Sequence, residues 1–194
     1  GPKFSENVLK ATQAFELVLT STQDLVGLPE SIQESAREYA LERGHSQAWL
    51  ISLDAPSMGP FLQYSQRRDL REKVWKAYSH RAVEGQFSNK ELTLQIVKLR
   101  HQRAKLLGCD SHAHFVLKKR MAESPKSVES FLSELHKAYW PAAQKDLQDI
   151  RLVGQEILGT SEIYPWDIAF LTNILKERRL GFREEELRCY FKLE

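Results

Sequence analysis

The sequence predicts a mainly α-helical fold, an irregular assembly of several helices with a minor strand element. Apolar residues recur at intervals of three and four positions along most of the 194 residues, which is the spacing of an amphipathic helix. The nine glycines and seven prolines are few, and several stand where such a stretch starts or stops. One compact apolar run, residues 48–53, carries aromatic and β-branched residues and indicates a short strand.

The first half of the chain is expected to form three helices, separated by a linker and by the strand. The first two helices begin at residues suited to a helix start, Ser5 and Pro29, and the second and third end at a glycine. The predicted elements are a helix from Ser5 through Val18, a linker at 20–27, a helix from Pro29 to Gly44, the strand at 48–53, and a helix from Arg67 to Gly85.

The second half is expected to be helical throughout. Ser88 and Glu91 have the spacing of a capping box, and Pro141 lies inside the longest predicted helix, where we expect a kink rather than an end. The predicted helices run from Ser88 to Gly108, from Ser111 to Arg120, from Ser124-Pro125 to Gly159, from Pro165 to Gly181, and onward from Glu184-Glu185-Glu186. The length allows one large domain or two sub-lobes, about 1–85 and 86–194.

Charge and cysteine content restrict the class of protein. The 28 basic and 26 acidic residues are interspersed along the chain, so we expect no nucleic-acid partner, and no apolar stretch is long enough to predict a membrane partner. Cys109 and Cys189 are too few for a disulfide framework and favour two free thiols in the cytoplasm, although one bridge and a periplasmic or organellar location stay open. Gly1-Pro2 resembles an expression-tag scar, so we expect the native N-terminus to be missing.

Catalytic motifs are missing from the sequence. None of the six histidines has another histidine four residues away, so there is no H-E-x-x-H zinc motif. Neither a G-x-S-x-G elbow nor a phosphate-binding glycine pattern is present. Cys109, His112 and His114 lie close together in sequence, which leaves a metal-dependent or thiol-dependent enzyme as one alternative. We otherwise predict no catalytic residue and no metal ligand in this chain.

A series of longer strings resembles the zinc metallopeptidase family of thimet oligopeptidase, oligopeptidase A and peptidyl-dipeptidase. The resemblance covers almost the whole chain, from about Phe4 to the end. The strings, in order, are Asp54-x-Pro56-Ser57-x-x-Pro60, Arg68-x-Leu70-Arg71-Glu72-x-Val74, Ala77-Tyr78-x-x-Arg81-Ala82, Arg103-Ala104-Lys105-Leu106-Leu107-Gly108, Met121-Ala122-x-Ser124-Pro125-x-x-Val128-x-x-Phe131-Leu132 and Pro165-Trp166-Asp167.

The resemblance implies a zinc-dependent oligopeptidase or peptidyl-dipeptidase as the parent protein. Members of that family are mainly helical, surround a narrow channel, hold one zinc with H-E-x-x-H and a downstream Glu, and cleave short peptides with metal-activated water. Their zinc helix lies downstream of the Pro165-Trp166-Asp167 string, and this chain stops at Glu194. We therefore expect a helical fragment of a larger peptidase domain, a scaffold and channel-wall portion that is inactive and binds no zinc by itself.

The matched strings are expected to act as structural signatures. We expect Pro165 to start a helix whose N-terminus Asp167 stabilises while Trp166 packs, and Arg71 or Arg81 to pair with a carboxylate. The remaining signature residues are Pro56, Ser57, Tyr78, Gly108, Ser124 and Pro125.

Two further expectations concern partners. Surfaces that missing segments would cover should be exposed and should favour self-association. The alternative function is a free-standing, non-catalytic helical binding module, which a native stop codon after Glu194 would favour.

Overall fold

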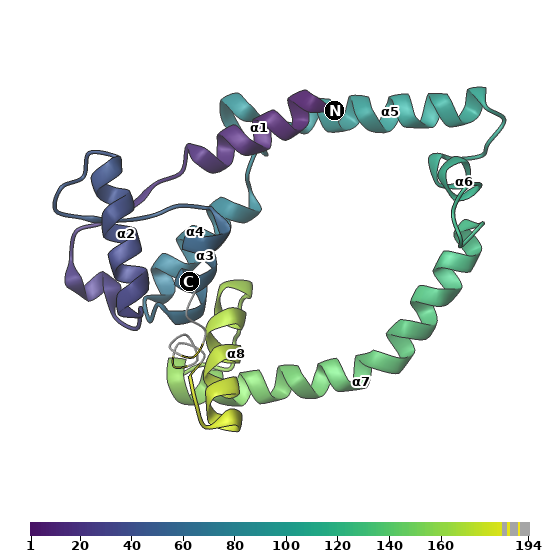
Figure 1. Ribbon diagram of the computed structural model, residues 1–194. Coiled ribbons are helices and arrows are strands. Elements are labelled where there is room, and N and C mark those ends of the chain that lie inside the picture. The colour runs from purple at the N-terminus through teal and green to yellow at the C-terminus, as the bar shows by residue number, and fades with distance from the viewer. Residues whose placement is uncertain (184–185, 187–189, 191–194) are drawn as a thin grey trace. The chain divides into compact units, whose positions relative to one another are not determined.

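The computed structural model describes residues 1–183, 186 and 190, and it confirms a mainly helical fold with one small sheet (Figure 1). Glu184, Glu185 and Cys189 lie outside the described residues, and so does most of the helix predicted there. The elements are α1 (Pro2–Gln13), β1 (Leu17–Leu19), η1 (Thr22–Leu25), α2 (Glu30–Glu42), β2 (Trp49–Ile51), α3 (Ala55–Tyr64), α4 (Arg68–Ser79), η2 (Gly85–Phe87), α5 (Lys90–Leu106), α6 (His112–Leu117), α7 (Pro125–Leu158) and α8 (Pro165–Leu180).

The chain divides into two compact units. The first, here called the sheet unit, comprises Pro2–Arg81 and Gln148–Glu194, and the second, here called the helical unit, comprises Ala82–Leu147 together with Gly1. Helix α7 contributes to both units and continues through Pro141. The predicted sub-lobes, about 1–85 and 86–194, stay a prediction.

The sheet unit contains the short sheet, in which β1 pairs antiparallel with β2. The strand predicted at 48–53 is confirmed, but the first predicted helix was extended too far, because α1 ends at Gln13. Leu17 and Leu19 are buried on one side of β1, and Val18 between them is exposed. Burial therefore alternates with the two-residue period of a strand, although three consecutive apolar residues also fit a helical stripe.

Two clusters of buried side chains hold the sheet unit together. One joins β1, β2, α2, α3 and α4, and the other joins α7 to α8. Helices α3 and α4 both pack on α8. The buried residues of the two clusters are Leu17, Leu19, Leu25, Leu28, Ala36, Ile51, Leu53, Phe61 and Val74 in the first cluster, and Val153, Phe170 and Leu171 in the second.

Two glycines permit close approaches within this unit. Gly27 has a φ of +92°, and a Cβ atom there would lie 2.3 Å from the backbone oxygen of Tyr64. Gly154 lies inside α7, where a Cβ atom would lie 2.3 Å from Cδ1 of Ile163 and 3.2 Å from the backbone oxygen of Thr160. The backbone contact at Gly27 is shorter than a Cβ atom allows, so this position requires glycine. At Gly154 the Ile163 side chain would have to move, and the Thr160 oxygen would be tightly packed.

The helical unit is built from η2, α5, α6 and the first part of α7. Helix α5 ends in a Schellman motif, in which Gly108 has a φ of +68° and the Cys109 N–H donates to the Ala104 oxygen at 2.9 Å. This turn leads into α6, whose start is capped by the Ser111 hydroxyl. The Arg103 guanidinium lies 4.8 Å from the centroid of the Phe115 ring, which joins α5 to α6.

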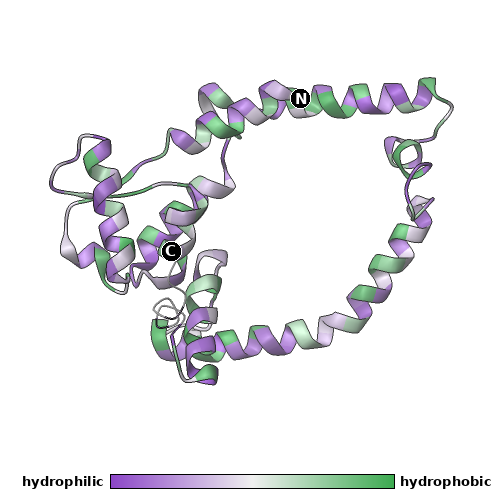
Figure 2. Ribbon diagram, in the orientation of Figure 1, coloured by the Kyte–Doolittle hydropathy of each residue, from purple (hydrophilic) through white to green (hydrophobic). Residues whose placement is uncertain are grey.

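Apolar side chains of the helical unit are largely exposed. Hydrophobic residues recur along α5 and α7 (Figure 2), yet Leu94 is 72% exposed and Leu106 is 88% exposed.

Among the described residues, no helix has both the length and the apolar character needed to span a membrane.

A buried arginine–aspartate cluster as candidate functional site

The most unusual polar feature of the described chain is a buried cluster formed by Arg68, Arg71 and Asp167. Helix α4 begins at Arg68, and because residues three apart lie on the same helix face, Arg68 and Arg71 point the same way. Helix α8 begins at Pro165, which places Asp167 in its first turn. The side chains of Arg71 and Asp167 are 0% exposed, and that of Arg68 is 34% exposed.

Both oxygens of the Asp167 carboxylate are occupied. Arg71 Nη2 donates to Oδ1 at 2.9 Å, and Arg68 donates through Nη2 to Oδ2 at 2.7 Å and through Nε to Oδ1 at 3.0 Å. The backbone N–H of Tyr164 donates to Oδ2 at 3.1 Å, as in one half of a capping box. Asp167 therefore contacts the start of α8 as well as the two arginines, and its stabilisation of this helix stays a prediction.

The buried guanidinium of Arg71 is also satisfied by backbone carbonyls. Its Nη1 donates to the oxygen of Ser65 at 2.7 Å, and its Nε donates to the oxygen of Trp166 at 3.1 Å. The guanidinium carbon lies 4.2 Å from the centroid of the Phe170 ring. One side chain of α4 thus contacts the first residue after α3 and the first turns of α8.

The charges in the cluster shift one another's titration. Burial, the largest influence, raises the pKa of Asp167, but hydrogen bonds from Arg68, Tyr164 and Arg71 together hold this pKa below its ordinary value. Burial lowers the pKa of Arg71, against the opposing hydrogen bond from Asp167. The hydrogen bond to Asp167 raises the pKa of Arg68. The carboxyl group of Asp167 is therefore ionised near neutral pH, and arginine side chains keep their charge in proteins.

This arrangement suits a structural clamp better than acid–base chemistry. A general base needs a lone pair directed at a substrate, whereas the Asp167 oxygens accept from two guanidinium groups and a backbone N–H. Breaking a buried pair leaves an uncompensated charge, so the cluster strongly couples α4 to α8. The centroid of the Trp166 ring lies 4.8 Å from that of Tyr164 and 5.8 Å from that of Trp75.

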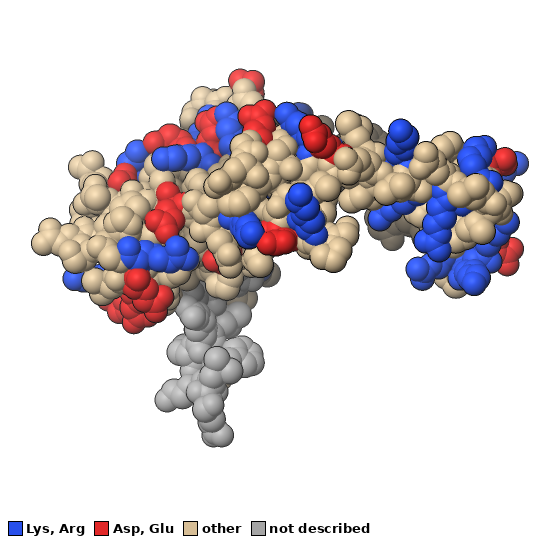
Figure 3. Space-filling view, turned by 90° about the horizontal axis from the view of Figure 1, so that it is seen from above, with Lys and Arg blue, Asp and Glu red and all other residues tan. Residues whose placement is uncertain are grey.

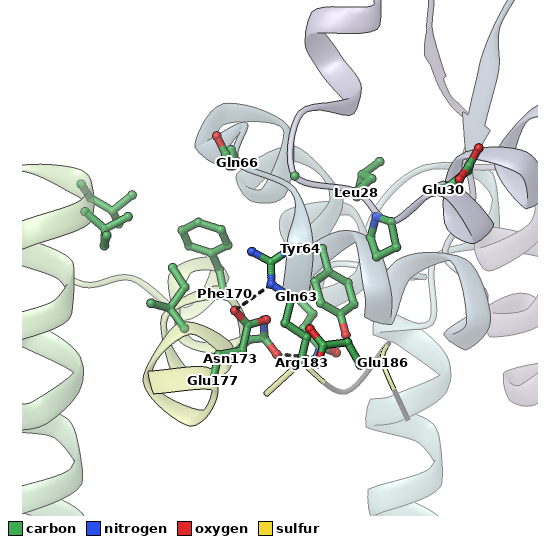
Figure 4. Close-up of a pocket in the computed structure, with 15 residues that line it drawn as sticks. Leu28, Glu30, Gln63, Tyr64, Gln66, Phe170, Asn173, Glu177, Arg183 and Glu186 are labelled. Carbon is green, nitrogen blue, oxygen red and sulfur yellow. Dashed lines mark hydrogen bonds and ion pairs between the residues drawn. The ribbon is translucent and has the colours of Figure 1, made fainter. Parts of the chain in front are cut away.

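A cavity of about 870 Å³ lies beside the cluster within the sheet unit. Its walls are formed by the start of α2, the ends of α3 and α7, and α8 (Figure 4). Gln63 donates to Oδ1 of Asn173 at 2.8 Å, and Asn173 donates to Glu177 at 2.8 Å, so one wall is a chain of amides and a carboxylate. Its described lining residues include no Ser, Cys, Thr or His that could serve as a nucleophile or imidazole base.

Other signature residues of the sheet unit lie outside the cluster. Pro56 and Ser57 occupy the first turn of α3, where the Ser57 hydroxyl accepts from the Ser52 N–H at 3.0 Å. The guanidinium carbon of Arg81 lies 3.5 Å from the centroid of the Tyr78 ring. The Arg81 side chain also donates to Thr12 Oγ1 at 3.2 Å and to the backbone oxygen of Tyr78 at 2.8 Å. Of the two arginines expected to pair with a carboxylate, the structure pairs Arg71.

Signature residues of the helical unit terminate or start helices. Gly108 lies in the Schellman motif that ends α5, and Pro125 is the first residue of α7. The hydroxyl of Ser124 accepts from the Ser127 N–H at 3.1 Å, as a helix cap does. These residues shape the backbone locally and are not brought together.

Sequence reasoning did not assign a role to Arg68 or to the Gln63–Asn173 pair. Arg68 lies three positions before Arg71 in the same string, so helical spacing could have indicated a shared partner. Gln63 and Asn173 are 110 residues apart along the chain, and nothing in the sequence relates them.

The residues that are present do not fit the zinc site that the family resemblance implies. Among residues 1–183, 186 and 190, no three His, Cys, Asp or Glu side chains lie where they could hold one metal ion. His114 Nδ1 pairs with the Ser111 hydroxyl at 2.9 Å, and the His112 ring stacks on Phe115. Cys109 is a buried free thiol.

Comparisons with known proteins define the family. The model of Peptidase family M3 matches residues 61–194. The organellar oligopeptidase A of Arabidopsis thaliana, chloroplastic/mitochondrial, is 39% identical over 199 residues, which cover 98% of this chain and 25% of that protein. Oligopeptidase A of Escherichia coli is 35% identical over 196 residues, covering 98% and 29%. Dipeptidyl carboxypeptidase of Escherichia coli is 29% identical over 192 residues, covering 98% and 28%.

The family model and the relatives that are 35–39% identical agree with one another. The chain belongs to Peptidase family M3. It spans about a quarter of the length of the curated relatives that it matches.

Proposed function

We propose that this chain is a scaffold and channel-wall portion of a zinc-dependent metallopeptidase that cleaves short peptides, and that it has no peptidase activity by itself. One observation carries the proposal: the chain belongs to Peptidase family M3, yet its 194 residues contain no H-E-x-x-H motif. The relatives' names support oligopeptides as the substrate class of the parent protein.

The arginine–aspartate cluster supports the scaffold role. Arg71 and Asp167 belong to two strings of the family resemblance and lie 96 positions apart in the sequence. In the structure their ion pair joins α4 to α8. Signature residues that fix helix ends and pair helices are what a framework needs. In this proposal the zinc and its activated water belong to parts of the parent protein outside these residues.

Hydrolysis of a quenched fluorescent peptide by the purified chain tests the proposal. The assay contains added zinc and is repeated with a chelator, while circular dichroism verifies a helical fold. We expect no cleavage under either condition. Chelator-sensitive cleavage would contradict the proposal and would restore the alternative built on Cys109, His112 and His114.

Metal content further distinguishes the proposed scaffold from a metal-dependent enzyme. Elemental analysis of the purified chain after dialysis should find zinc far below one ion per chain. If stoichiometric zinc is retained, His112→Ala and the control His80→Ala, which changes a histidine of the sheet unit, will locate the site. Retention of zinc that only His112→Ala abolishes would refute the proposed lack of a metal site.

Self-association is part of the same proposal. Phe131, Tyr139 and Trp140 on α7 are between 52% and 67% exposed, which is unusual for large aromatic side chains. Sedimentation velocity should reveal dimers or larger species whose population rises with concentration. A clean monomer that binds no apolar dye would argue against it.

A further inference from the structure

Basic and acidic residues are interspersed over most of the chain, but one stretch of the helical unit has an excess of positive charge. Residues 98–126 contain eight lysines and arginines but only two acidic residues, although the whole chain has a net charge of +2. Four of these cations lie on the second half of α5: Lys98, Arg100, Arg103 and Lys105. The other four flank the turn between α6 and α7: Lys118, Lys119, Arg120 and Lys126. We call these eight residues the basic surface.

The basic surface has no anionic partner within the described chain. All eight residues are exposed, and among residues 1–183, 186 and 190 none of them forms an ion pair. Only Arg103 has an aromatic contact, with the ring of Phe115. Self-repulsion of clustered cations costs free energy, so such a surface favours a carboxylate-rich or phosphate-rich partner.

The fold brings the two halves of the basic surface together. The Schellman turn at Gly108 reverses the chain after α5, and α6 packs back on α5 through the Arg103–Phe115 contact. Figure 3 shows blue lysine and arginine side chains, with few red acidic ones among them, at the right-hand end of the view. This is the end at which Figure 1 shows α6. The cations therefore gather at one end of the helical unit, although they come from separate elements and lie on more than one side of α5.

The side chains between the cations restrict the kind of partner. Leu106 and Met121 are 88% and 101% exposed, so a partner of the basic surface can contact apolar side chains as well as charges. Cations occur on several sides of α5 rather than on one face opposite an apolar face, which does not suit binding along a membrane surface. Single-stranded nucleic acid requires aromatic rings for base stacking, and Phe115, the aromatic ring in this stretch, already contacts Arg103 and His112.

We propose that the basic surface is a docking site for an acidic peptide, a polypeptide segment in which Glu or Asp alternates with apolar residues. Carboxylates pair with the lysines and arginines, and apolar side chains of the peptide cover Leu106 and Met121. The proposal is independent of whether the parent protein cleaves peptides.

Fluorescence anisotropy of a short labelled peptide of alternating Glu and Leu tests this site, with a Gln–Leu peptide as the uncharged probe. We expect the full chain to bind the Glu–Leu peptide and to release it as salt rises, because these charges are exposed. The variant Lys118→Glu/Lys119→Glu/Arg120→Glu should weaken binding about tenfold or more. A second variant, Lys98→Glu/Arg100→Glu/Lys105→Glu, should have a similar effect.

A matched control separates the surface from overall charge. Lys3→Glu/Arg37→Glu/Lys73→Glu changes the net charge equally at three exposed positions of the sheet unit and should leave binding unchanged. Equal loss in the control would overturn the proposal, as would equal binding of the Gln–Leu peptide or no binding near physiological salt. Tighter binding of an oligonucleotide, or of vesicles containing anionic lipid, would overturn the assignment to an acidic peptide.

Discussion

The two units of this protein use charge and apolar surface in opposite ways. In the sheet unit, many cations have anionic partners: Arg43 contacts Glu16, Arg178 contacts Glu156, and Arg71 is buried against Asp167. In the helical unit, eight neighbouring cations have no ionic partner among the described residues. Both buried apolar clusters lie in the sheet unit, where Phe61 and Leu171 are fully buried, whereas Leu94 and Leu106 of the helical unit are mostly exposed.

The difference indicates where each unit obtains its stability. The sheet unit has two apolar clusters and a buried ionic clamp, so its own contacts stabilise it. The helical unit relies on helix caps, the Schellman turn and local pairs, and its side chains point outward. Surfaces of the second kind are available for binding, whereas surfaces of the first kind tolerate few substitutions.

The largest loss of stability is expected from Asp167→Ala. Removing the carboxylate leaves the fully buried Arg71 without its anionic partner, which should reduce the free energy of unfolding by about 3–5 kcal/mol. Urea unfolding followed by circular dichroism measures this change. The control Asp69→Ala removes a carboxylate that is 65% exposed and paired with Arg67, and it should cost less than about 1 kcal/mol. Equal, small changes for both variants would show that the cluster does not clamp α4 to α8.

Gly27→Ala is expected to have the next largest effect. Gly27 and Gly44 both have positive φ angles, so alanine strains the backbone at either position by roughly 1–2 kcal/mol. A Cβ atom at Gly27 would also overlap the Tyr64 oxygen, whereas one at Gly44 would meet no atom within 4 Å. Gly27→Ala should therefore cost about 1–3 kcal/mol more than Gly44→Ala in the same unfolding measurement. Identical losses would mean that packing against Tyr64 is not tight.

Acid should weaken the sheet unit through Asp167. The pKa of Asp167 is lower in the folded than in the unfolded chain, so the carboxylate stabilises the fold fully above the unfolded pKa of about 4. This stabilisation is lost as the pH falls through the folded pKa. Urea unfolding at several pH values between about 5 and 2 should show a steeper decline for the natural chain than for Asp167→Asn. Parallel declines would exclude Asp167 as a source of the acid sensitivity.

Local features of the fold were predictable from sequence, but the cluster was only partly so. Gly108 ends α5 and Pro165 starts α8 because glycine and proline act through their own backbone geometry, which a single position reveals. Strand β1 was missed because its three apolar residues satisfy both a helical stripe and a strand, and only pairing with β2 decides between them.

Contacts between distant residues had no sequence signal. Asp167 was expected at a helix start, and it does accept the Tyr164 N–H there. Its burial beneath Arg68 and Arg71 depends on how α4 packs on α8, across separations of 99 and 96 residues. Side-chain type predicts that a buried charge needs a partner, whereas the tertiary fold determines which partner it has.

The smallest effect is expected from Leu106→Ser in the helical unit. Leu106 is 88% exposed, so replacing it removes little buried apolar surface and should change the free energy of unfolding by no more than about 0.5 kcal/mol. Leu171→Ala in the sheet unit removes a fully buried side chain and should cost about 2–5 kcal/mol. Urea unfolding compares the two. A loss above about 1 kcal/mol for Leu106→Ser would mean that its side chain is covered in solution, for example by a second copy of the chain, and a loss that falls with dilution would identify that copy as the partner.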